Sequence, residues 1–291
     1  MKLSGLHLLL TYECNMECEH CFVWGSPWNS GTMTLEDVRN ILRQARELDT
    51  VKWIYFEGGE PFLYYPLLLR AIEDAAAMGF KVGVVTNAYW ATTLADAFLW
   101  LRPLAGKVGD LSLSSDLFHS DELLSQRAQA ASTAATELGI RTEIITICGQ
   151  EDSATGESSV MHRGRAAEKL VDGCPRKDWT EFAECPHEDL REPGRVHIDP
   201  LGHVHICQGL SLGNLFRTEL ATICRRYEPG AHPIIGPLLE GGPAEILRRY
   251  DLPSTERYVD ACHLCYMVRA ELRPRFPEIL SPDQMYGVPP S

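Results

Sequence analysis

Three cysteines near the N-terminus, Cys14, Cys18 and Cys21, constrain this 291-residue chain more than any other feature. Their spacing, C-x3-C-x2-C, places three thiolates in one short loop. Thiolate sulfur is the ligand that iron–sulfur clusters prefer, and such clusters normally take four protein cysteines. Three cysteines hold three irons of a [4Fe–4S] cluster and leave the fourth iron open to a small molecule. The alternatives are a zinc knuckle completed by His20, or three reduced core cysteines.

A second motif, Phe56-Glu57-Gly58-Gly59-Glu60-Pro61, follows the apolar run 51–55, which the pattern predicts to be a buried strand. Two glycines at the end of a strand let the backbone approach a ligand closely, because neither carries a Cβ atom. Taken alone, such a motif is typical of a strand-to-helix turn. Its position downstream of the cysteine triplet gives it a more specific meaning.

Together the two motifs resemble the radical S-adenosylmethionine (radical SAM) superfamily. The resemblance implies a [4Fe–4S] cluster on the three cysteines and a bound SAM molecule. It also implies an electron donor such as flavodoxin or ferredoxin, and a partial (β/α)6 barrel. The residues expected to contact SAM or to shape its loop are Phe22 beside the adenine, Gly58 and Gly59 at the ammonium group, and Glu60 and Pro61.

Composition and charge make several classes of function less favoured. The net charge is −13, and no stripe rich in lysine and arginine is present, so a dominant nucleic-acid contact is disfavoured. The apolar segment 2–10 is too short for a signal peptide and is interrupted by His7, and no run approaches the length of a membrane span. We therefore expect a cytoplasmic protein in which clustered cysteines bind metal rather than form disulfides.

The first half of the chain alternates apolar runs with amphipathic stretches, which predicts an α/β fold with a parallel sheet. The expected strands are 6–12, 51–56, 80–85, 108–113 and 142–147, with a sixth near 157–161. The expected helices are 35–48, 66–78, 91–104 and 121–138. Thr34 and Asp37 form a sequence close to a capping box at the start of the first helix.

Ligand-binding groups in barrel-type α/β folds follow the carboxyl ends of the strands. After the cysteine loop and the glycine motif, Asn87 and Ser114 follow the next two expected strands, where they would contact the ribose or carboxylate of SAM or cap helices. Asp116 would serve as a proton acceptor or as a helix cap. Cys148 would donate a hydrogen atom to a substrate radical, or pack as a small core residue.

A second group of cysteines follows in the less periodic part of the chain: Cys185, Cys207, Cys262 and Cys265. Gly202 precedes Cys207 in a predicted hairpin formed by 195–198 and 203–206, and the last two cysteines form a C-x2-C pair. The pattern resembles the Twitch domain, a shorter relative of the SPASM domain, and implies a second, auxiliary [4Fe–4S] cluster. Cys174 is a rival for the first ligand, and a zinc ribbon is the alternative site.

These features predict a radical SAM barrel over residues 1–164, a small α+β Twitch-like domain over 165–273 and a proline-rich tail over 274–291. The expected reaction is reductive cleavage of SAM to a 5′-deoxyadenosyl radical, followed by abstraction of a substrate hydrogen. Oxidative modification of a peptide or protein, as in the maturation of ribosomally made peptides, is the first interpretation. The alternatives are a small-molecule dehydrogenase or epimerase, and a non-catalytic iron–sulfur or zinc protein on a degenerate barrel.

Overall fold

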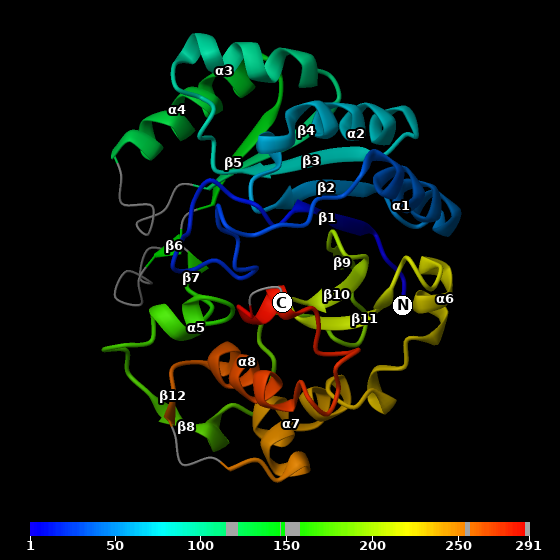
Figure 1. Ribbon diagram of the computed structural model, residues 1–291, viewed down its shortest axis with the longest axis vertical. Helices are drawn as coiled ribbons and strands as arrows, with labels where there is room; N and C mark the ends of the chain where they lie inside the picture. The colour runs from blue at the N-terminus through cyan, green and yellow to red at the C-terminus, as the bar shows by residue number, and fades with distance from the viewer. Residues whose placement is uncertain (115–121, 146, 149–157, 254–256, 289–291) are drawn as a thin grey trace.

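The largest sheet of the computed structural model, which describes residues 1–114, 122–145, 147–148, 158–253 and 257–288, has eight strands (Figure 1). Their order is β11-β10-β9-β1-β2-β3-β4-β5. Strands β1 to β5 are parallel to their neighbours, and β9 is parallel to β1. Strand β10 is antiparallel to both β9 and β11. The bounds are β1 Gly5–Thr11, β2 Trp53–Gly58, β3 Lys81–Thr86, β4 Val108–Ser114, β5 Arg141–Ile145, β9 Arg195–Ile198, β10 His203–Cys207 and β11 Leu210–Asn214.

Four helices connect the strands of the first half and lie together on one side of the sheet in Figure 1. The remaining helices lie on the other side, among the segments that follow β5. Among the described residues, no helix combines the length and the apolar character that crossing a membrane requires. The bounds are α1 Leu35–Leu48, α2 Tyr65–Ala77, α3 Leu94–Leu101, α4 Glu122–Glu137, α5 Ala166–Lys169, α6 Leu220–Arg226, α7 Ile235–Tyr250 and α8 Ala261–Leu272.

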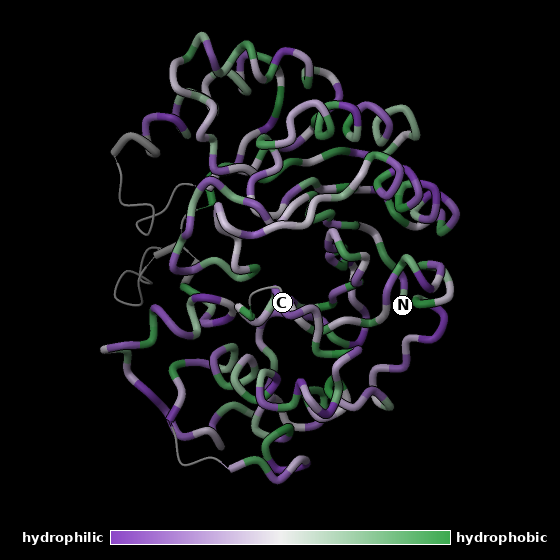
Figure 2. The backbone as a smooth tube through the Cα atoms, viewed as in Figure 1, coloured by the Kyte–Doolittle hydropathy of each residue, from purple (hydrophilic) through white to green (hydrophobic). Residues whose placement is uncertain are grey.

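Helix α1 illustrates how local sequence determines these elements. Thr34 accepts a hydrogen bond from the backbone N–H of Asp37, and the Asp37 carboxylate accepts one from the backbone N–H of Thr34, so the predicted capping box is confirmed. The helix alternates hydrophilic and hydrophobic residues in Figure 2, as an amphipathic helix does. Its apolar stripe, which includes Val38, Ile41 and Leu42, is buried against the sheet.

The predicted α/β class, with a parallel sheet, is confirmed. Five predicted strands and four predicted helices agree with the structure to within about two residues at most ends. Helix α3 is shorter than expected and continues as the short 3-10 helix Arg102–Leu104, in which Pro103 lacks the N–H that a longer helix needs. The described residues form an open sheet rather than a closed barrel.

The expectation that a sixth strand of this sheet lies near 157–161 was wrong. The strand found there, β7 (Ser158–Ser159), pairs with β6 (Ile147–Cys148) in a separate two-stranded sheet. The sixth parallel strand of the main sheet is instead β9, which pairs with β1 on its free edge. The predicted hairpin of β9 and β10 is confirmed, and it extends the main sheet instead of forming an independent one.

The helices α7 and α8 enclose a second apolar cluster, together with segments from the N-terminal loop and the tail. In the tail, the side chains of Met285 and Tyr286 are buried, and Gln284 Nε2 donates hydrogen bonds to the carbonyl oxygens of Val23 and Trp24. The tail therefore packs against the loop that carries the first three cysteines.

Candidate functional site

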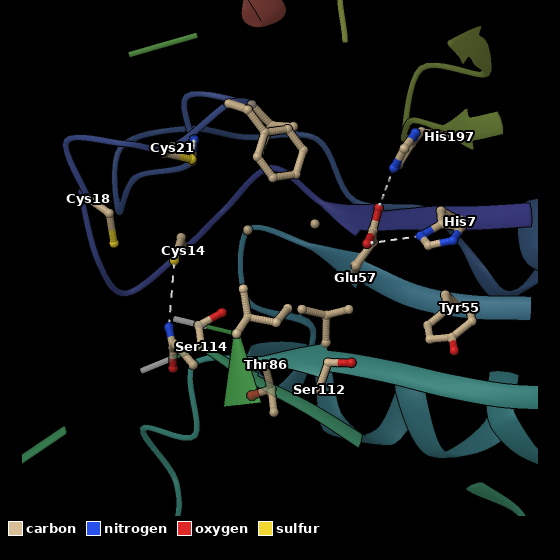
Figure 3. Close-up of a pocket in the computed structure, with 18 of the residues that line it drawn as sticks. His7, Cys14, Cys18, Cys21, Tyr55, Glu57, Thr86, Ser112, Ser114 and His197 are labelled. Carbon is tan, nitrogen blue, oxygen red and sulfur yellow. Dashed lines mark hydrogen bonds and ion pairs between the residues drawn. The ribbon is translucent and has the colours of Figure 1, made fainter. Parts of the chain in front are cut away.

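A cavity of about 470 Å³ lies on the face of the sheet that is turned away from α1 to α4. Along β1, Leu6 and Leu8 pack into the core with these helices, whereas His7 between them lines the cavity, as the alternation of strand side chains requires. Cys14 and Cys18 line the cavity, as does Cys21, and Figure 3 shows the three at one end of it. Gly58 and Gly59 of the glycine motif line the same cavity.

The cysteine loop is held by Arg165, whose side chain is almost entirely buried. Its Nη1 donates to the carbonyl oxygen of Cys18 at 2.6 Å, and its Nη2 donates to that of Gly25 at 2.9 Å. Its backbone N–H donates to the carbonyl oxygen of Cys21. Hydrogen bonds between charged donors and carbonyls are among the stronger ones in proteins, so Arg165 fixes the loop in one conformation. Arg165 was not predicted from the sequence to belong to this site.

The two glycines of Gly58-Gly59 are needed because the loop after β2 lies directly against the cysteine loop. A Cβ atom on Gly59 would lie 2.0 Å from the carbonyl oxygen of Glu13, and one on Gly58 would lie 2.4 Å from that of Thr11. The backbone N–H of Gly59 donates to Thr11 O at 2.7 Å. Both glycines line the cavity, so this close approach brings backbone atoms to the ligand space.

Glu60 is fully buried and binds backbone and side-chain donors of two loops. Its Oε1 accepts hydrogen bonds from Phe62 N at 3.0 Å and from Thr86 Oγ1 at 2.8 Å, and its Oε2 accepts one from Asn87 N at 2.8 Å. Burial raises the pKa of Glu60 to about 7, against these three donors, which lower it. The carboxylate therefore connects the loops after β2 and β3.

Replacing Glu60 by glutamine is expected to lower the free energy of unfolding by about 1–3 kcal/mol, because the amide NH₂ would face a backbone or hydroxyl donor and leave it unsatisfied. Chemical denaturation of the two proteins at the same pH measures this difference. The matched control is Glu137→Gln at an exposed position, for which no more than about 0.5 kcal/mol is expected. Equal stability of the Glu60→Gln variant and the unmodified protein would contradict the role assigned to Glu60.

Three further residues expected to contact SAM, Phe22, Asn87 and Ser114, also line the cavity. Asn87 Nδ2 contacts Cys14 Sγ at 3.8 Å and donates to Asn15 Oδ1 at 2.9 Å, so it lies against the cysteine loop. Pro61 instead begins the short 3-10 helix Pro61–Tyr64, where a missing N–H costs nothing. Asp116 lies outside the described residues. Cys148 belongs to β6, and its side chain lies outside the part of the chain that the structure describes.

The surroundings of Cys14 suit a thiolate that binds a metal. Burial raises the pKa of the Cys14 thiol to about 12, so a free thiol there stays protonated at neutral pH. The backbone N–H of Met16 donates to Cys14 Sγ at 3.4 Å, and that of Gly25 donates to Cys21 Sγ at 3.2 Å. Donors directed at sulfur stabilise negative charge on it, and a bound metal supplies the remaining positive charge. The donor set is all sulfur, as iron–sulfur clusters require.

The second group of cysteines lines a separate cavity, which is small and largely apolar. Burial raises the pKa values of three of these thiols, to about 11 for Cys265, and neighbouring sulfur atoms of the group raise them further. Cys174 is absent from the described residues that line this cavity, and its Sγ donates to the carbonyl oxygen of Leu170 at 3.2 Å. The cysteines that share the cavity are Cys185, Cys207, Cys262 and Cys265.

Two buried arginines accompany these four thiols, and neither was predicted from the sequence to belong to the site. Arg163 Nη1 donates to Cys207 Sγ at 3.4 Å and lies 3.3 Å from Glu188 Oε1. Arg269 is 1% exposed, and its Nη1 donates to the carbonyl oxygen of Gln208 at 2.9 Å. Positive charge beside several buried sulfur atoms favours their thiolate form, which is the form that binds a metal. The cavity therefore fits a four-thiolate metal centre.

At the other end of this cavity lies a polar cluster on neighbouring strands that was not predicted from the sequence. His7 on β1, Glu57 on β2 and His197 on β9 all line the cavity, and Figure 3 shows their side chains converging on Glu57. The sequence does contain one indication of this cluster. The alternation of side chains along β1 places the polar residue His7 on the cavity face of an otherwise apolar strand. Parallel strands of α/β folds are normally apolar on both faces, so a polar inner face indicates a ligand cavity.

Comparison with known proteins agrees with this geometry. Residues 8–108 match the model of the Radical SAM superfamily. YydG of Bacillus subtilis (strain 168), named for peptide biosynthesis, is 30% identical over 81 residues, which are 28% of this chain and 25% of YydG. The match therefore spans about a quarter of the length of that curated relative.

Two solved structures share the fold. SuiB of Streptococcus suis bound to S-adenosylmethionine aligns over 85% of this chain and 74% of its own, with 14% identity and a TM-score of 0.54. BtrN in complex with AdoMet and 2-DOIA aligns over 77% of this chain and 82% of its own, with 15% identity and a TM-score of 0.51. The alignments extend past residue 108 and cover most of each chain. The chain therefore carries a Radical SAM domain over residues 8–108.

Proposed function

We propose that this protein cleaves S-adenosylmethionine reductively and uses the product radical to abstract a hydrogen atom from its substrate. One observation carries the proposal: the cysteine loop and the double-glycine loop are hydrogen-bonded to each other and line one cavity. When bound, the reduced cluster supplies the electron that breaks a C–S bond of SAM, which yields the 5′-deoxyadenosyl radical. The protein would hold the cluster and SAM in position and exclude water from the cavity that contains them.

The residues of this chain have separate tasks in the proposal. Cys14, Cys18 and Cys21 would hold the cluster, with Arg165 fixing their loop. Backbone atoms of Gly58 and Gly59 would bind the amino group of SAM, since these glycines bring the chain to the edge of the cavity. The side chains that remain for the adenosine moiety and the carboxylate are Phe22, Asn87 and Ser114, all of which line the same space.

The second cavity supports a further proposal, that four cysteines hold an auxiliary [4Fe–4S] cluster. Cys185, Cys207, Cys262 and Cys265 would complete its shell without an open iron, which favours electron transfer over direct substrate binding. Arg163 and Arg269 would stabilise the thiolates. We propose that the auxiliary domain covers residues 165–273. The barrel would then cover residues 1–164, and the tail would cover residues 274–291. Asp116 and Cys148 stay proposed as the proton acceptor and the hydrogen donor.

The substrate that we propose is a peptide or protein that undergoes oxidative modification. One similarity supports this class: YydG, which is 30% identical over 81 residues, is named for peptide biosynthesis. The structural likeness to BtrN in complex with AdoMet and 2-DOIA favours a second candidate, dehydrogenation or epimerisation of a small molecule. We further propose that a flavodoxin or ferredoxin supplies the electron, that the protein works in the cytoplasm, and that it uses neither nucleic acid nor a membrane.

Anaerobic reconstitution with iron and sulfide tests the proposal. We expect about eight irons per chain, from two four-iron clusters, and formation of 5′-deoxyadenosine when SAM and a reductant are added. Iron is measured by inductively coupled plasma mass spectrometry, and the nucleoside by liquid chromatography. A protein that takes up only zinc under these conditions and leaves SAM intact would overturn the proposal.

Replacing Cys185 by alanine is expected to remove about half of the iron and to spare SAM cleavage, because only the auxiliary cluster loses a ligand. The matched control is Cys174→Ala, which removes a half-exposed cysteine outside that cavity and should keep all of the iron. The opposite result, loss of iron in the Cys174 variant and retention in the Cys185 variant, would show that Cys174 is the ligand.

A further inference from the structure

A cluster of three potential ligands lies inside the main cavity, away from the cysteine loop. His7 on β1 is paired in register with His197 on β9, and Glu57 lies on β2 at the other side of β1. Figure 3 shows the three side chains at the opposite end of the cavity from Cys14, Cys18 and Cys21. The proposed SAM chemistry gives none of the three a task.

The geometry of the cluster suits a cation. Glu57 Oε2 is 3.2 Å from His7 Nδ1, and Glu57 Oε1 is 3.2 Å from His197 Nε2. One ligand atom from each residue can be chosen so that all three lie within 4.8 Å of one another. Ligand atoms that share a tetrahedral zinc ion, each about 2.1 Å from the metal, are about 3.4 Å apart. Each histidine nitrogen therefore lies at about one edge length from a carboxylate oxygen of Glu57, His7 Nδ1 from Oε2 and His197 Nε2 from Oε1.

An ion pair without metal explains the cluster less well. The Glu57 Oε1 atom is buried and has no hydrogen-bond partner among the described residues, although His197 Nε2 lies close to it. A neutral imidazole that donated its N–H to this oxygen would satisfy it. The other oxygen, Glu57 Oε2, shares a hydrogen bond with His7 Nδ1, so the unmatched pair is Oε1 and His197 Nε2. A cation bound between these two atoms would satisfy both. An unsatisfied buried carboxylate oxygen is otherwise unfavourable, because it has lost its hydration without gaining a hydrogen-bond partner.

We propose that His7, Glu57 and His197 bind a divalent transition-metal ion, Zn²⁺ in the first place, through two imidazole nitrogens and one carboxylate. This donor set is that of catalytic zinc sites, which keep a position open for a substrate or water. Here the open position faces the cavity, so the ion would bind an oxygen donor of the substrate, such as a carbonyl or carboxylate. The proposal concerns the substrate end of the cavity and does not depend on SAM cleavage.

The neighbours of the cluster support this assignment. The ring of Tyr55 stacks on that of His7 with a centroid distance of 4.7 Å, which fixes the plane of the imidazole. The Tyr55 hydroxyl donates to Asp110 Oδ2 at 2.9 Å, so that ring is held in turn. Ligands whose orientation is fixed by surrounding groups bind metal more tightly than free ones.

The test uses the full chain without an affinity tag, anaerobically reconstituted so that iron occupies the cysteines, then equilibrated with Zn²⁺ alone and desalted. We expect about one zinc per chain, with an X-ray absorption spectrum that shows only nitrogen and oxygen neighbours at about 2.0–2.1 Å. Sulfur neighbours at about 2.3 Å would place the zinc on cysteines and overturn the proposal, as would the absence of retained zinc. This measurement needs no variant, so a folding defect cannot obscure it.

Two variants make the assignment specific. His197→Ala and Glu57→Gln should each weaken zinc binding by at least about 100-fold in a calorimetric titration, because the first removes a ligand and the second replaces an anionic ligand with a neutral amide. The matched control, His203→Ala, removes a histidine on β10 that does not line this cavity and should bind zinc as the unmodified protein does. Unchanged zinc affinity in both ligand variants would overturn the proposal.

One further variant separates this inference from the proposed function. The Cys14→Ala, Cys18→Ala, Cys21→Ala variant should lose SAM cleavage and keep its zinc with nitrogen and oxygen ligands. Loss of this zinc in the triple variant would tie the metal to the cysteine loop and contradict the site assigned to it.

Discussion

Simultaneous replacement of Cys14, Cys18 and Cys21 by alanine is expected to abolish the cleavage of SAM and to remove about half of the iron. The three thiolates are the protein ligands of one cluster in the proposal, and a cluster without them cannot be retained. The remaining iron, about four atoms per chain, should stay on the four cysteines of the second cavity. Measurement of iron and of 5′-deoxyadenosine in the same preparation tests both effects together.

The matched control for this experiment is Cys224→Ala, which removes a buried cysteine on α6 that lies in the core cluster behind the sheet. That variant should keep its iron and its ability to cleave SAM, although it loses some stability. SAM cleavage at an undiminished rate in the triple variant would show that the first three cysteines are not the site.

Substitution of Gly59 by alanine is expected to lower SAM cleavage by at least about 100-fold. The added Cβ would lie 2.0 Å from the backbone carbonyl oxygen of Glu13, and that oxygen belongs to the cysteine loop. Backbone cannot move aside as a flexible side chain does, so the two loops must separate. A displacement of about 1 Å at a reacting centre is enough to cost about 100-fold in rate. Rates of 5′-deoxyadenosine formation at saturating SAM measure the effect.

The control for Gly59→Ala is Gly109→Ala on β4, where the nearest atom to an added Cβ is Val82 O at 3.8 Å, an ordinary contact. This variant changes the same residue type without a clash and should cleave SAM normally. If the Gly59→Ala variant cleaves SAM as fast as the Gly109→Ala variant, the close contact between the loops has no bearing on catalysis.

The sequence was sufficient to predict those parts of the fold that depend on local pattern. The capping box at Thr34 and the apolar stripe of α1 lie within single helices, and the strands β1 to β5 are bounded by their own turns. The cysteine loop and the glycine motif could be placed together because loops after successive parallel strands meet at one edge of the sheet. The spacing of the cysteines was also sufficient to select the residues proposed to bind each of the two clusters.

Features that depend on contacts distant in sequence were not predictable in this way. The pairing of β9 with β1 joins segments about 190 residues apart, and nothing in either strand identifies its partner. For the same reason the cluster of His7, Glu57 and His197 was missed. Arg163 and Arg269 were also missed, because a buried arginine resembles a surface arginine until the thiols around it are known.

The most direct test uses electron–nuclear double resonance on the reduced, reconstituted protein with SAM that carries ¹⁷O in its carboxylate and ¹⁵N in its amino group. We predict hyperfine couplings to both labels, because the iron that lacks a cysteine ligand binds these two groups. A cluster whose spectrum is the same with and without labelled SAM would contradict the proposal that the C-x3-C-x2-C loop leaves one iron open to this ligand.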